Sequence, residues 1–332
     1  MSLVVACLDV WAEAVRCEVQ SAAPAGWQLR FAQSYDAAHQ QALAAGAQAL
    51  LPGFARVDEA LLAAAPGVRW VHKWGIGIDV IDLAALRRRG IGLAITAGAN
   101  SQPVAEMALA LMLAVYRRIP YVNRAIRQGL WPTPEMRETC FQIQGKTVGL
   151  YGFGQIGQRL AQLLQGFEVQ ILYHDLQAAP PETEARLRAR RVGLDELLAT
   201  SDILSLHAPL TEATRHAINA EALARMKAGA ILINTSRGGL IDEAALCAAL
   251  QYGHLRGAGL DAFDPEPPAP NNPLLALEQV VVTPHAGGGV FDNVVHVARH
   301  AFGNLARWQH GQAVTAPDLI LAPAARSEGV QA

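Results

Sequence analysis

The chain has 332 residues, of which 52% are hydrophobic, and its formal net charge is −2. This composition is enough for the buried cores of two ordinary domains, and it excludes global disorder. It provides neither a basic field for nucleic acid nor a polybasic membrane anchor.

The four cysteines, Cys7, Cys17, Cys140 and Cys247, are scattered and form no CxxC pair, which indicates free thiols in a reducing compartment. The N-terminal stretch lacks the basic region of a signal peptide, and no run of about 18 apolar residues is free of charge. The histidines show no metal-ligand spacing. We therefore expect a cytoplasmic protein without a membrane span, a nucleic-acid partner or a metal site.

Strand-like apolar runs alternate with Ala- and Leu-rich helical patterns in the first third of the chain. The expected strands are "LVVACLD", "WQLRFA", "QALLPG", "VRWVHKW" and "GLAIT", at residues 3–9, 27–32, 48–53, 68–74 and 92–96. The helical patterns between them include residues 36–45, 56–65 and 82–89. Such runs are typical of a parallel sheet that is covered on both faces.

Residues 101–127 follow, and their apolar positions cover most of a helical circumference, which predicts one long and mostly buried helix. A second series of strands is expected in "TVGLYG", "VQILYHD", "DILSLHAP", "AILINTS", "GAGLDAF" and "VVVTPHA", between residues 147 and 286. A last helical pattern covers 290–309, and the tail beyond 315 is expected to be loosely ordered. The pattern predicts an α/β protein with two doubly wound parallel-sheet domains.

Gly152, Gly154 and Gly157 stand between an expected strand and an expected helix in the pattern GxGxxG. Glycines at these positions permit a tight turn and the close approach of a pyrophosphate to the helix N-terminus. Asp175, at the end of the next strand, can accept hydrogen bonds from the adenosine ribose hydroxyls. Its charge would repel a 2′-phosphate, so NAD is expected rather than NADP. The structural alternative is that the glycines only make a tight turn.

Three side chains of different chemistry follow the ends of later strands: Arg237 in "INTSRGGLIDE", Glu266 in "GLDAFDPEPP" and His285 in "VVVTPHAGGG". Open α/β sheets build their sites at such ends. An arginine can hold a 2-oxo carboxylate and polarise the carbonyl, a histidine can transfer a proton, and a glutamate can orient the ring and stabilise the imidazolium. Each residue also has a structural interpretation when it is taken alone. Arg237 could cap a helix or bind a phosphate, Glu266 could be a solvated loop acid, and His285 could be only a turn residue.

The loop around Glu266 is unusual because "DPEPPAP", residues 264–270, contains four prolines. Each proline removes a backbone donor and fixes one φ angle, so the loop can form neither helix nor sheet. We expect it to have a fixed shape that aims Glu266 at His285.

Together the motifs resemble the D-isomer-specific 2-hydroxyacid dehydrogenase family along essentially the whole chain. The segments that resemble it are "KWGIGIDVIDL", "NSQPVAEMALALML", "VGLYGFGQIG", "HAPLT", "NTSRGGLIDE", "DAFDPEP" and "TPHAGG". The resemblance implies a discontinuous substrate domain, 1–98 and 291–332, a central NAD-binding Rossmann domain, 99–290, and an active-site cleft between them. It implies an NAD-dependent oxidoreductase that interconverts a small 2-oxo acid and its D-2-hydroxy acid, with glyoxylate, hydroxypyruvate and larger 2-oxo acids all open as substrates.

The resemblance also assigns site residues. It implies Arg237, Glu266 and His285 as the catalytic trio, and it places Ile76 and Gly77 where the family offers backbone N–H groups to the substrate carboxylate. The positions that fall on cofactor contacts are Gly152, Gly154, Gln155, Ile156, Gly157, Asp175, His207, Ala208, Pro209, Thr235, Ser236, Asp261 and Gly287. Because the family is usually dimeric through its central domain, it implies a homodimer that uses the long helix and the loop at Trp131.

Other activities stay open at this point. Enzymes that oxidise phosphite resemble this family, because they use the same trio together with a lysine near the carboxylate loop. Lys73 keeps this activity open, because it adjoins that loop. Formate oxidation fits less well, because those relatives carry a glutamine where Glu266 stands. From another class, the fold also serves as an NAD-sensing corepressor that binds peptides. Activity on 3-phosphoglycerate is disfavoured, because Pro52, Gly53 and Phe54 stand where arginines would be expected.

Overall fold

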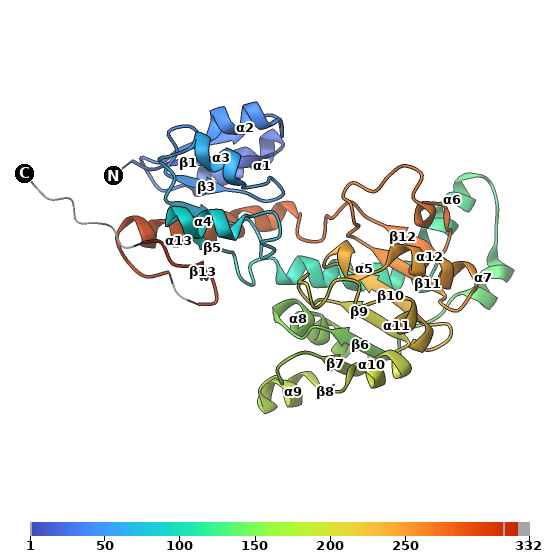
Figure 1. The fold of residues 1–332 in the computed structure, drawn as a ribbon. Helices are drawn as coiled ribbons and strands as arrows, with labels where there is room; N and C mark the ends of the chain where they lie inside the picture. The colour runs from blue at the N-terminus through green and yellow to red at the C-terminus, as the bar shows by residue number, and fades with distance from the viewer. Residues whose placement is uncertain (1, 315, 325–332) are drawn as a thin grey trace, which may run out of the picture. The chain divides into compact units, whose positions relative to one another are not determined.

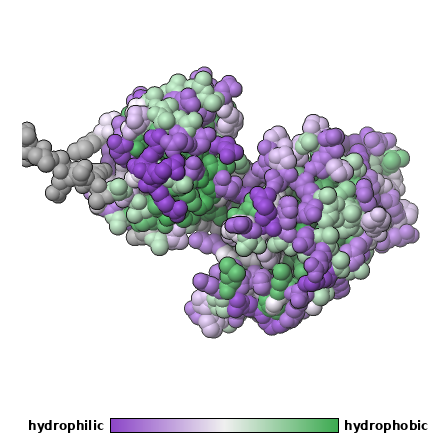
Figure 2. Space-filling model, viewed as in Figure 1, coloured by the Kyte–Doolittle hydropathy of each residue, from purple (hydrophilic) through white to green (hydrophobic). Residues whose placement is uncertain are grey.

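The structure is a computed structural model that describes residues 2–314 and 316–324. The chain divides into two compact units: unit 1 comprises 1–100 and 290–332, and unit 2 comprises 101–289. Figure 1 shows a sheet flanked by helices in each of them. Figure 2 shows that hydrophilic residues cover much of the visible face of each unit, and that hydrophobic patches lie among these hydrophilic residues.

The sheet of unit 1 has six strands in the order β13-β5-β4-β3-β1-β2 among the described residues. Their bounds are β1 (Val4–Val10), β2 (Gln28–Ala32), β3 (Ala49–Leu51), β4 (Trp70–His72), β5 (Gly92–Ala94) and β13 (Leu319–Leu321). β1 to β5 pair in parallel, whereas β13 is antiparallel to β5. The parallel order 2-1-3-4-5 is that of flavodoxin-like sheets.

Both faces of this sheet are covered by helices. The bounds are α1 (Glu13–Ala22), α2 (Ala37–Ala44), α3 (Glu59–Ala64), α4 (Leu83–Arg89), η4 (Phe291–Asn293) and α13 (Val294–Gln309). α2, α3 and α4 share one buried apolar cluster, and α1 and α13 share another. The aspartates at the N-caps of α3 and α4 stabilise the starts of these helices. Asp58 accepts a hydrogen bond from Leu61 N, and Asp82 accepts one from Ala85 N, in the first turns.

The sheet of unit 2 has seven described strands in the order β12-β11-β10-β9-β6-β7-β8. The bounds are β6 (Thr147–Tyr151), β7 (Gln170–His174), β8 (Ala189–Arg191), β9 (Ile203–Leu206), β10 (Ile231–Asn234), β11 (Gly257–Leu260) and β12 (Val280–Val282). All neighbouring pairs are parallel, and the order reverses beside β6. This is the Rossmann order, whose ligands bind at that switch point.

Helices cover this second sheet on both faces as well. Their bounds are α5 (Ser101–Tyr116), α6 (Ile119–Arg127), α7 (Thr133–Thr139), α8 (Gln155–Leu163), η1 (Leu164–Phe167), α9 (Pro181–Leu187), α10 (Leu194–Thr200), α11 (Ala220–Arg225), η2 (Gly238–Leu240), α12 (Glu243–Gln251) and η3 (Pro273–Ala276). α5 and α8 pack in one buried cluster, and α10, α11 and α12 pack in the other. The α/β architecture predicted from the sequence is therefore confirmed.

The expected single helix over 101–127 is wrong, because α5 ends at Tyr116 and α6 begins at Ile119. Pro120 has no N–H to donate to the carbonyl of Tyr116, and its ring would crowd that carbonyl in a continuous helix. The carbonyl instead accepts a hydrogen bond from Phe141 N at 2.9 Å. Arg118, between the helices, has a left-handed φ of 48°.

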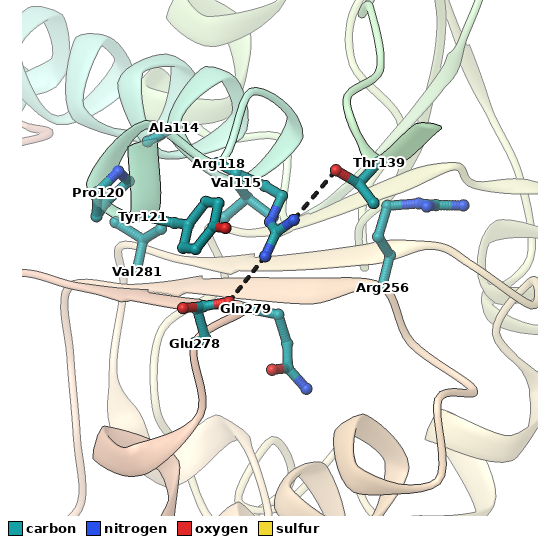
Figure 3. A pocket seen from close by; sticks show the side chains of 10 residues that line it. All are labelled: Ala114, Val115, Arg118, Pro120, Tyr121, Thr139, Arg256, Glu278, Gln279 and Val281. Atoms are coloured by element: carbon teal, nitrogen blue, oxygen red, sulfur yellow. Dashed lines mark hydrogen bonds and ion pairs between the residues drawn. The ribbon is translucent and has the colours of Figure 1, made fainter. Parts of the chain in front are cut away.

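Contacts of the Arg118 side chain fix the bend. Its guanidinium forms ion pairs with Glu135 at 2.5 Å and Glu278 at 2.8 Å, and it donates to Thr139 Oγ1 at 3.1 Å. Figure 3 shows the guanidinium between Thr139 and Glu278, with Tyr121 beside it. One arginine therefore ties the bend to α7 and to the start of β12.

The expectation of a loosely ordered tail is wrong for residues 316–324, and the rest of that expectation lies outside the described residues. Asp318 accepts a hydrogen bond from Ile95 N through its main-chain oxygen, at 2.9 Å. Its carboxylate accepts from Ala97 N at 3.1 Å and pairs with His300 at 2.6 Å. Asp318 directly precedes β13, which pairs with β5, a strand far away in the sequence. No helix in the described ranges is long and apolar enough to cross a bilayer.

Candidate active site

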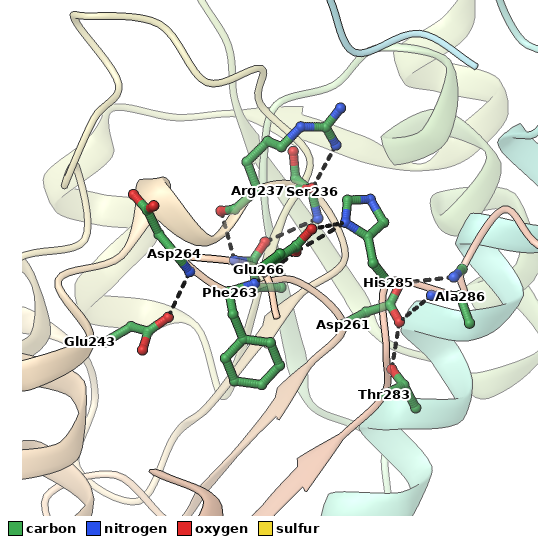
Figure 4. Close-up of polar contacts among 12 residues, drawn as sticks. Ser236, Arg237, Glu243, Asp261, Phe263, Asp264, Glu266, Thr283, His285 and Ala286 are labelled. Atoms are coloured by element: carbon green, nitrogen blue, oxygen red, sulfur yellow. Dashed lines mark hydrogen bonds and ion pairs between the residues drawn. The ribbon is translucent and has the colours of Figure 1, made fainter. Parts of the chain in front are cut away.

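Arg237, Glu266 and His285 follow three neighbouring strands of unit 2. Arg237 precedes η2 after β10, Glu266 lies in the proline loop after β11, and His285 lies just past β12. Because β10, β11 and β12 are adjacent and parallel, their carboxyl ends lie along one edge of the sheet. Figure 4 shows the Glu266 carboxylate pointing toward the His285 ring.

Glu266 and His285 are in direct contact. Nδ1 of the imidazole lies 2.8 Å from Oε2 and 3.0 Å from Oε1 of the carboxylate. The backbone of His285 has a left-handed φ of 52°, an uncommon conformation for a residue with a side chain. The carboxylate is held from a second side, because Oε1 also accepts the N–H of Phe263 at 2.9 Å.

These contacts keep Glu266 ionised. Burial by itself would raise the pKa of the carboxyl group, but the hydrogen bonds from His285 and the Phe263 N–H outweigh it. With the charges of His285 and Arg237, they lower the pKa of Glu266 below its ordinary value. An ionised carboxylate beside Nδ1 fixes the orientation of the imidazole ring.

The backbone that carries Arg237 lies against the loop that carries Glu266. A Cβ on Gly238 would lie 1.9 Å from the carbonyl carbon of Phe263, so only glycine permits this approach. The Arg237 carbonyl accepts from Nδ2 of the buried Asn234 at 2.9 Å, and its guanidinium donates to the Ser236 carbonyl at 2.8 Å. Arg237 and Glu266 are thereby held within reach of each other's charge.

The proline loop is anchored at both ends by one carboxylate. Glu243, at the start of α12, accepts from Asp264 N at 3.0 Å and from Asn272 Nδ2 at 2.7 Å. The fixed loop shape expected from the prolines therefore has an additional support that the sequence motif did not identify.

Asp261 positions the segment that contains His285. This aspartate is 1% exposed, and its Oδ1 accepts from Thr283 Oγ1 at 2.6 Å and from Ala286 N at 2.8 Å. Its Oδ2 accepts from Gly287 N at 2.8 Å. The sequence indicated Asp261 only as a cofactor contact, whereas its contacts within the protein are with residues on both sides of the histidine.

The glycine loop after β6 is shaped for a ligand. Gly152 has φ 98°, and a Cβ there would lie 2.5 Å from Ala208 N; a Cβ on Gly157 would lie 2.5 Å from the Gly152 carbonyl. At Gly154, by contrast, a Cβ would meet nothing within 4 Å. α8 begins at Gln155, and its N-cap Gly154 supplies no side chain to cap it. The uncapped N–H groups and the open space fit a pyrophosphate.

Further groups around this loop also fit a dinucleotide. Asp175, after β7, accepts from Phe153 N at 2.7 Å, which couples it to the glycine loop. The buried Oγ1 of Thr235 has no hydrogen-bond partner within the described residues, and a bound ligand could supply one. His207 pairs with Ser205 Oγ at 2.9 Å, and burial lowers its pKa to about 4, so the ring is neutral at physiological pH.

The remaining expected cofactor positions belong to the same edge of unit 2. Ser236 donates through Oγ to the Ala208 carbonyl at 2.6 Å, which joins the segments after β9 and β10. Ile156 lies in the first turn of α8, and Pro209 follows Ala208. Gly287 is the residue whose N–H Asp261 holds.

Ile76 and Gly77 lie in unit 1, in the loop after β4. Within the described residues, no hydrogen bond from the N–H of either residue is found, so both can donate to a ligand. Thr96 supports the loop, because its Oγ1 accepts from Gly75 N at 2.7 Å.

The sequence reasoning missed Asn100 beside this loop. Its Oδ1 is buried without a partner among the described residues. A Cβ on Gly75 would lie 3.7 Å from Lys73 Nζ and 4.0 Å from Asn100 Nδ2. The signal was present in "NSQPVAE", but nothing in that motif shows that its asparagine lies beside the loop after β4.

A parallel Rossmann sheet with a glycine loop at its switch point, and an arginine, a glutamate and a histidine at the ends of neighbouring strands, defines an NAD-dependent dehydrogenase. Residues 109–287 match the family model described as "D-isomer specific 2-hydroxyacid dehydrogenase, NAD binding domain". The chain belongs to this family. It is an NAD-dependent oxidoreductase that interconverts a 2-oxo acid and a 2-hydroxy acid.

Individual relatives agree with this assignment. The chain is 39% identical over 258 residues to a glyoxylate reductase of Korarchaeum cryptofilum, covering 77% of each protein. It is 42% identical over 234 residues to a hydroxypyruvate reductase of Thermotoga maritima, covering 70% of this chain and 74% of that protein. A D-3-phosphoglycerate dehydrogenase of Mycobacterium tuberculosis is 43% identical over 231 residues, but these cover 70% of this chain and only 43% of that protein.

Among solved structures, an NAD-dependent formate dehydrogenase of Staphylococcus aureus in complex with NAD superposes with a TM-score of 0.84. The sequences are 25% identical, and the match covers 97% of this chain and 100% of that one.

Proposed function

We propose that the protein reduces a 2-oxo acid to its D-2-hydroxy acid, with glyoxylate, hydroxypyruvate and larger 2-oxo acids as the candidate substrates. The observation that carries the proposal is the contact between Glu266 and His285, 2.8 Å long, beside Arg237 and on the same sheet as the glycine loop. A paired acid and imidazole next to a guanidinium suit a reaction that moves one proton to or from a carboxylate-bearing substrate.

Each member of the trio has one proposed role. Arg237 holds the substrate carboxylate through its planar fork and polarises the 2-oxo group. His285 donates a proton to the carbonyl oxygen as that oxygen gains negative charge, and it takes the proton back in the oxidising direction. Glu266 keeps the ring oriented and stabilises the imidazolium. NADH, when bound, supplies the hydride.

We assign unit 2 to NAD binding and unit 1 to substrate binding. In unit 1, the N–H groups of Ile76 and Gly77 would hold the carboxylate. In unit 2, the residues proposed to contact NAD are Gly152, Gly154, Gln155, Ile156, Gly157, Asp175, His207, Ala208, Pro209, Thr235, Ser236, Asp261 and Gly287. The uncapped start of α8 supports a pyrophosphate site there, and Asp175 supports a preference for NAD over NADP.

We also propose a homodimer formed through α6 and the segment that follows it. Ile119, Ile126, Leu130 and Trp131 are all exposed there, and Trp131 is 78% exposed. Exposed apolar residues that cluster on one segment mark interaction surfaces. Replacing Trp131 with arginine should shift the protein toward monomer in analytical ultracentrifugation, whereas Tyr252→Arg, at an equally exposed aromatic, should not. A monomeric native protein would refute the proposal.

A cytoplasmic location is proposed from the four free thiols of Cys7, Cys17, Cys140 and Cys247, of which Cys17 is exposed. Cell fractionation tests it directly.

The decisive experiment is a screen of 2-oxo acids with NADH, in which oxidation of NADH is followed and the chirality of the product is determined. Turnover above about 1 s⁻¹ that yields the D-isomer supports the proposal. An L-product would refute the stereochemistry, and no turnover with any 2-oxo acid would refute the function. Reverse assays with NAD and phosphite or formate test the rival oxidations. Tight NADH binding without turnover would instead favour a corepressor scaffold.

A further inference from the structure

The aspartate that directly precedes β13 joins two parts of unit 1. The side chain of Asp318 is 14% exposed, and its Oδ2 accepts a hydrogen bond from Asn304 Nδ2 at 2.9 Å and pairs with His300 Nε2 at 2.6 Å, both on α13. Its Oδ1 accepts from Ala97 N at 3.1 Å, in the segment after β5. Burial by itself would raise the pKa of this carboxyl group, but the hydrogen bonds from Asn304 and His300 outweigh it and lower the pKa. The side chain is therefore an ionised carboxylate that accepts hydrogen bonds on both oxygens.

Asp318 fixes the residues on both sides of Thr96. Its main-chain oxygen accepts from Ile95 N at 2.9 Å, and its carboxylate accepts from Ala97 N. Thr96 lies between these two residues and is fully buried. Because hydrogen bonds from the same aspartate hold the backbone before and after Thr96, a loss of Asp318 would release the segment that places this threonine.

Thr96 in turn holds the loop proposed to bind the substrate carboxylate. Its Oγ1 accepts from Gly75 N at 2.7 Å, and its own N–H donates to the Gly75 carbonyl at 3.1 Å. Gly75 has a φ of 110°, and Ile76 and Gly77 follow it directly. Hydrogen bonds weaken steeply as the donor turns away from the acceptor. A shift of Gly75 would therefore misalign the two N–H groups that follow it.

We propose that Asp318 is a positioning residue for the carboxylate loop, which it controls through Thr96 and Gly75. The segment before β13 is then part of the substrate-binding apparatus of unit 1. The inference rests on the proposed function, because it uses the Ile76–Gly77 carboxylate site. Without Asp318, the carboxylate of the substrate is held less well, whereas the groups for proton transfer and NAD binding, in unit 2, are unaffected. The expected signature is a higher KM for the 2-oxo acid at unchanged kcat.

The main test is Asp318→Ala, which removes every side-chain contact of this residue. With the 2-oxo acid that the native enzyme reduces best, KM should rise about tenfold, the usual loss when a hydrogen bond to a charged group is weakened. The kcat and the Kd of NADH, measured by fluorescence titration, should stay unchanged. Removing a negative charge would by itself favour the binding of an anionic acid. A higher KM therefore has the opposite sign to the electrostatic effect and reports the geometry of the loop.

Three further variants separate positioning from a general loss of stability. Asp318→Asn can still accept from Ala97 N but not on both terminal atoms, so its KM should rise by less than that of Asp318→Ala. Thr96→Val keeps the shape of the side chain but removes the acceptor for Gly75 N, and it should raise KM as Asp318→Ala does. Val19→Ala leaves a small cavity at a buried position of α1 in the same unit, so it should lower the melting temperature without raising KM.

The outcomes decide between the inference and the proposed function. An unchanged KM in Asp318→Ala, or in Asp318→Asn where the alanine variant does not fold, overturns the inference and leaves the proposed function intact. An equal rise of KM in Val19→Ala also overturns it, because the effect would then follow from lost stability alone. A native protein that turns over no 2-oxo acid overturns the proposed function, and the inference with it.

Discussion

Asp261 holds residues on both sides of His285. It accepts from Thr283 Oγ1 at 2.6 Å before the histidine and from Ala286 N and Gly287 N, both at 2.8 Å, after it. A carboxylate is suited to this task because it offers only acceptors. The position of His285, the proposed proton donor, is thereby set by a residue that directly follows the neighbouring strand β11.

Asp261→Asn should therefore reduce kcat by about ten- to a hundredfold. The amide nitrogen would face an N–H or hydroxyl donor, and an unsatisfied buried group costs about 1–3 kcal/mol. Steady-state kinetics and thermal melts check this, with Thr283→Val as the milder variant, because it removes only the hydroxyl donor. An unchanged kcat would show that the acceptor pattern of Asp261 is dispensable.

Glu266→Gln should alter the pH profile of reduction. Because the pKa of Glu266 is lowered, its charge is present above its ordinary titration range and is lost only as pH falls through the lowered value. The glutamine variant lacks this titrating carboxylate, so its kcat/KM at neutral pH should fall about tenfold, ~1.4 kcal/mol, and its profile should lose the acid limb that the protonation of Glu266 gives the native enzyme. Superimposable profiles of the native and variant enzymes would mean that Glu266 acts only as a loop residue.

Arg237→Lys keeps the positive charge but removes the planar two-donor fork. We expect kcat/KM for the 2-oxo acid to fall about ten- to a hundredfold, with NADH affinity little changed, because a hydrogen bond to a charged group contributes about 1.5–3 kcal/mol. NADH affinity is measured by fluorescence titration. Arg225→Lys, in a surface ion pair, is the matched control. If the lysine variant kept its full kcat/KM, the substrate anchor would have to be another group.

Cofactor choice can be tested at Asp175. The native enzyme should prefer NAD to NADP by at least about tenfold, ~1.4 kcal/mol, because the carboxylate repels a 2′-phosphate. Asp175→Asn removes the charge but retains an acceptor for Phe153 N, so it should narrow the preference without disturbing the glycine loop. Asp195→Asn, at an exposed surface position, is the control for net charge. Equal native kcat/KM values with both cofactors would contradict the prediction.

Acid stability should depend on His72 in unit 1. Burial, together with the charge of His300, lowers the pKa of His72 to about 3, whereas an unfolded chain restores a value near 6.5. The unfolded state therefore binds the proton more tightly. Stability is fully present above pH 6.5 and is lost as pH falls toward 3, by about 1.4 kcal/mol between pH 7.5 and 5.5.

Chemical denaturation at the two pH values measures this loss. His72→Gln should remove most of it, whereas His310→Gln, at an exposed position, should not. An equal pH dependence in native and His72→Gln proteins would assign the acid sensitivity to other groups.

Local patterns carried enough information to predict most of the architecture and the order of the trio. Gly152 and Gly157 could be interpreted from spacing alone, because a tight strand-to-helix turn requires residues without side chains. Pro120 was also a visible signal of the break before α6, but the apolar pattern on both sides outweighed it. The missing N–H of that proline is the physical reason for the break.

Contacts between distant segments could not be predicted in this way. β13 is fixed by Asp318, which pairs with groups near residues 95 and 300, and no local period indicates that partnership. Asp261 and Glu243 are ordinary acids in the sequence. Their roles arise only when the fold brings backbone N–H groups from other loops to each carboxylate.

Arg237, Glu266, His285 and the glycine loop all belong to residues 101–289, whereas Ile76 and Gly77 belong to the other unit. This division of labour has an evolutionary consequence. If the proposed division holds, substitutions in unit 1 can change which acid is accepted while the groups for hydride and proton transfer in unit 2 are inherited intact. A lineage built on this plan would acquire new metabolic roles through changes in one unit alone, and directed evolution of substrate choice should place its libraries there.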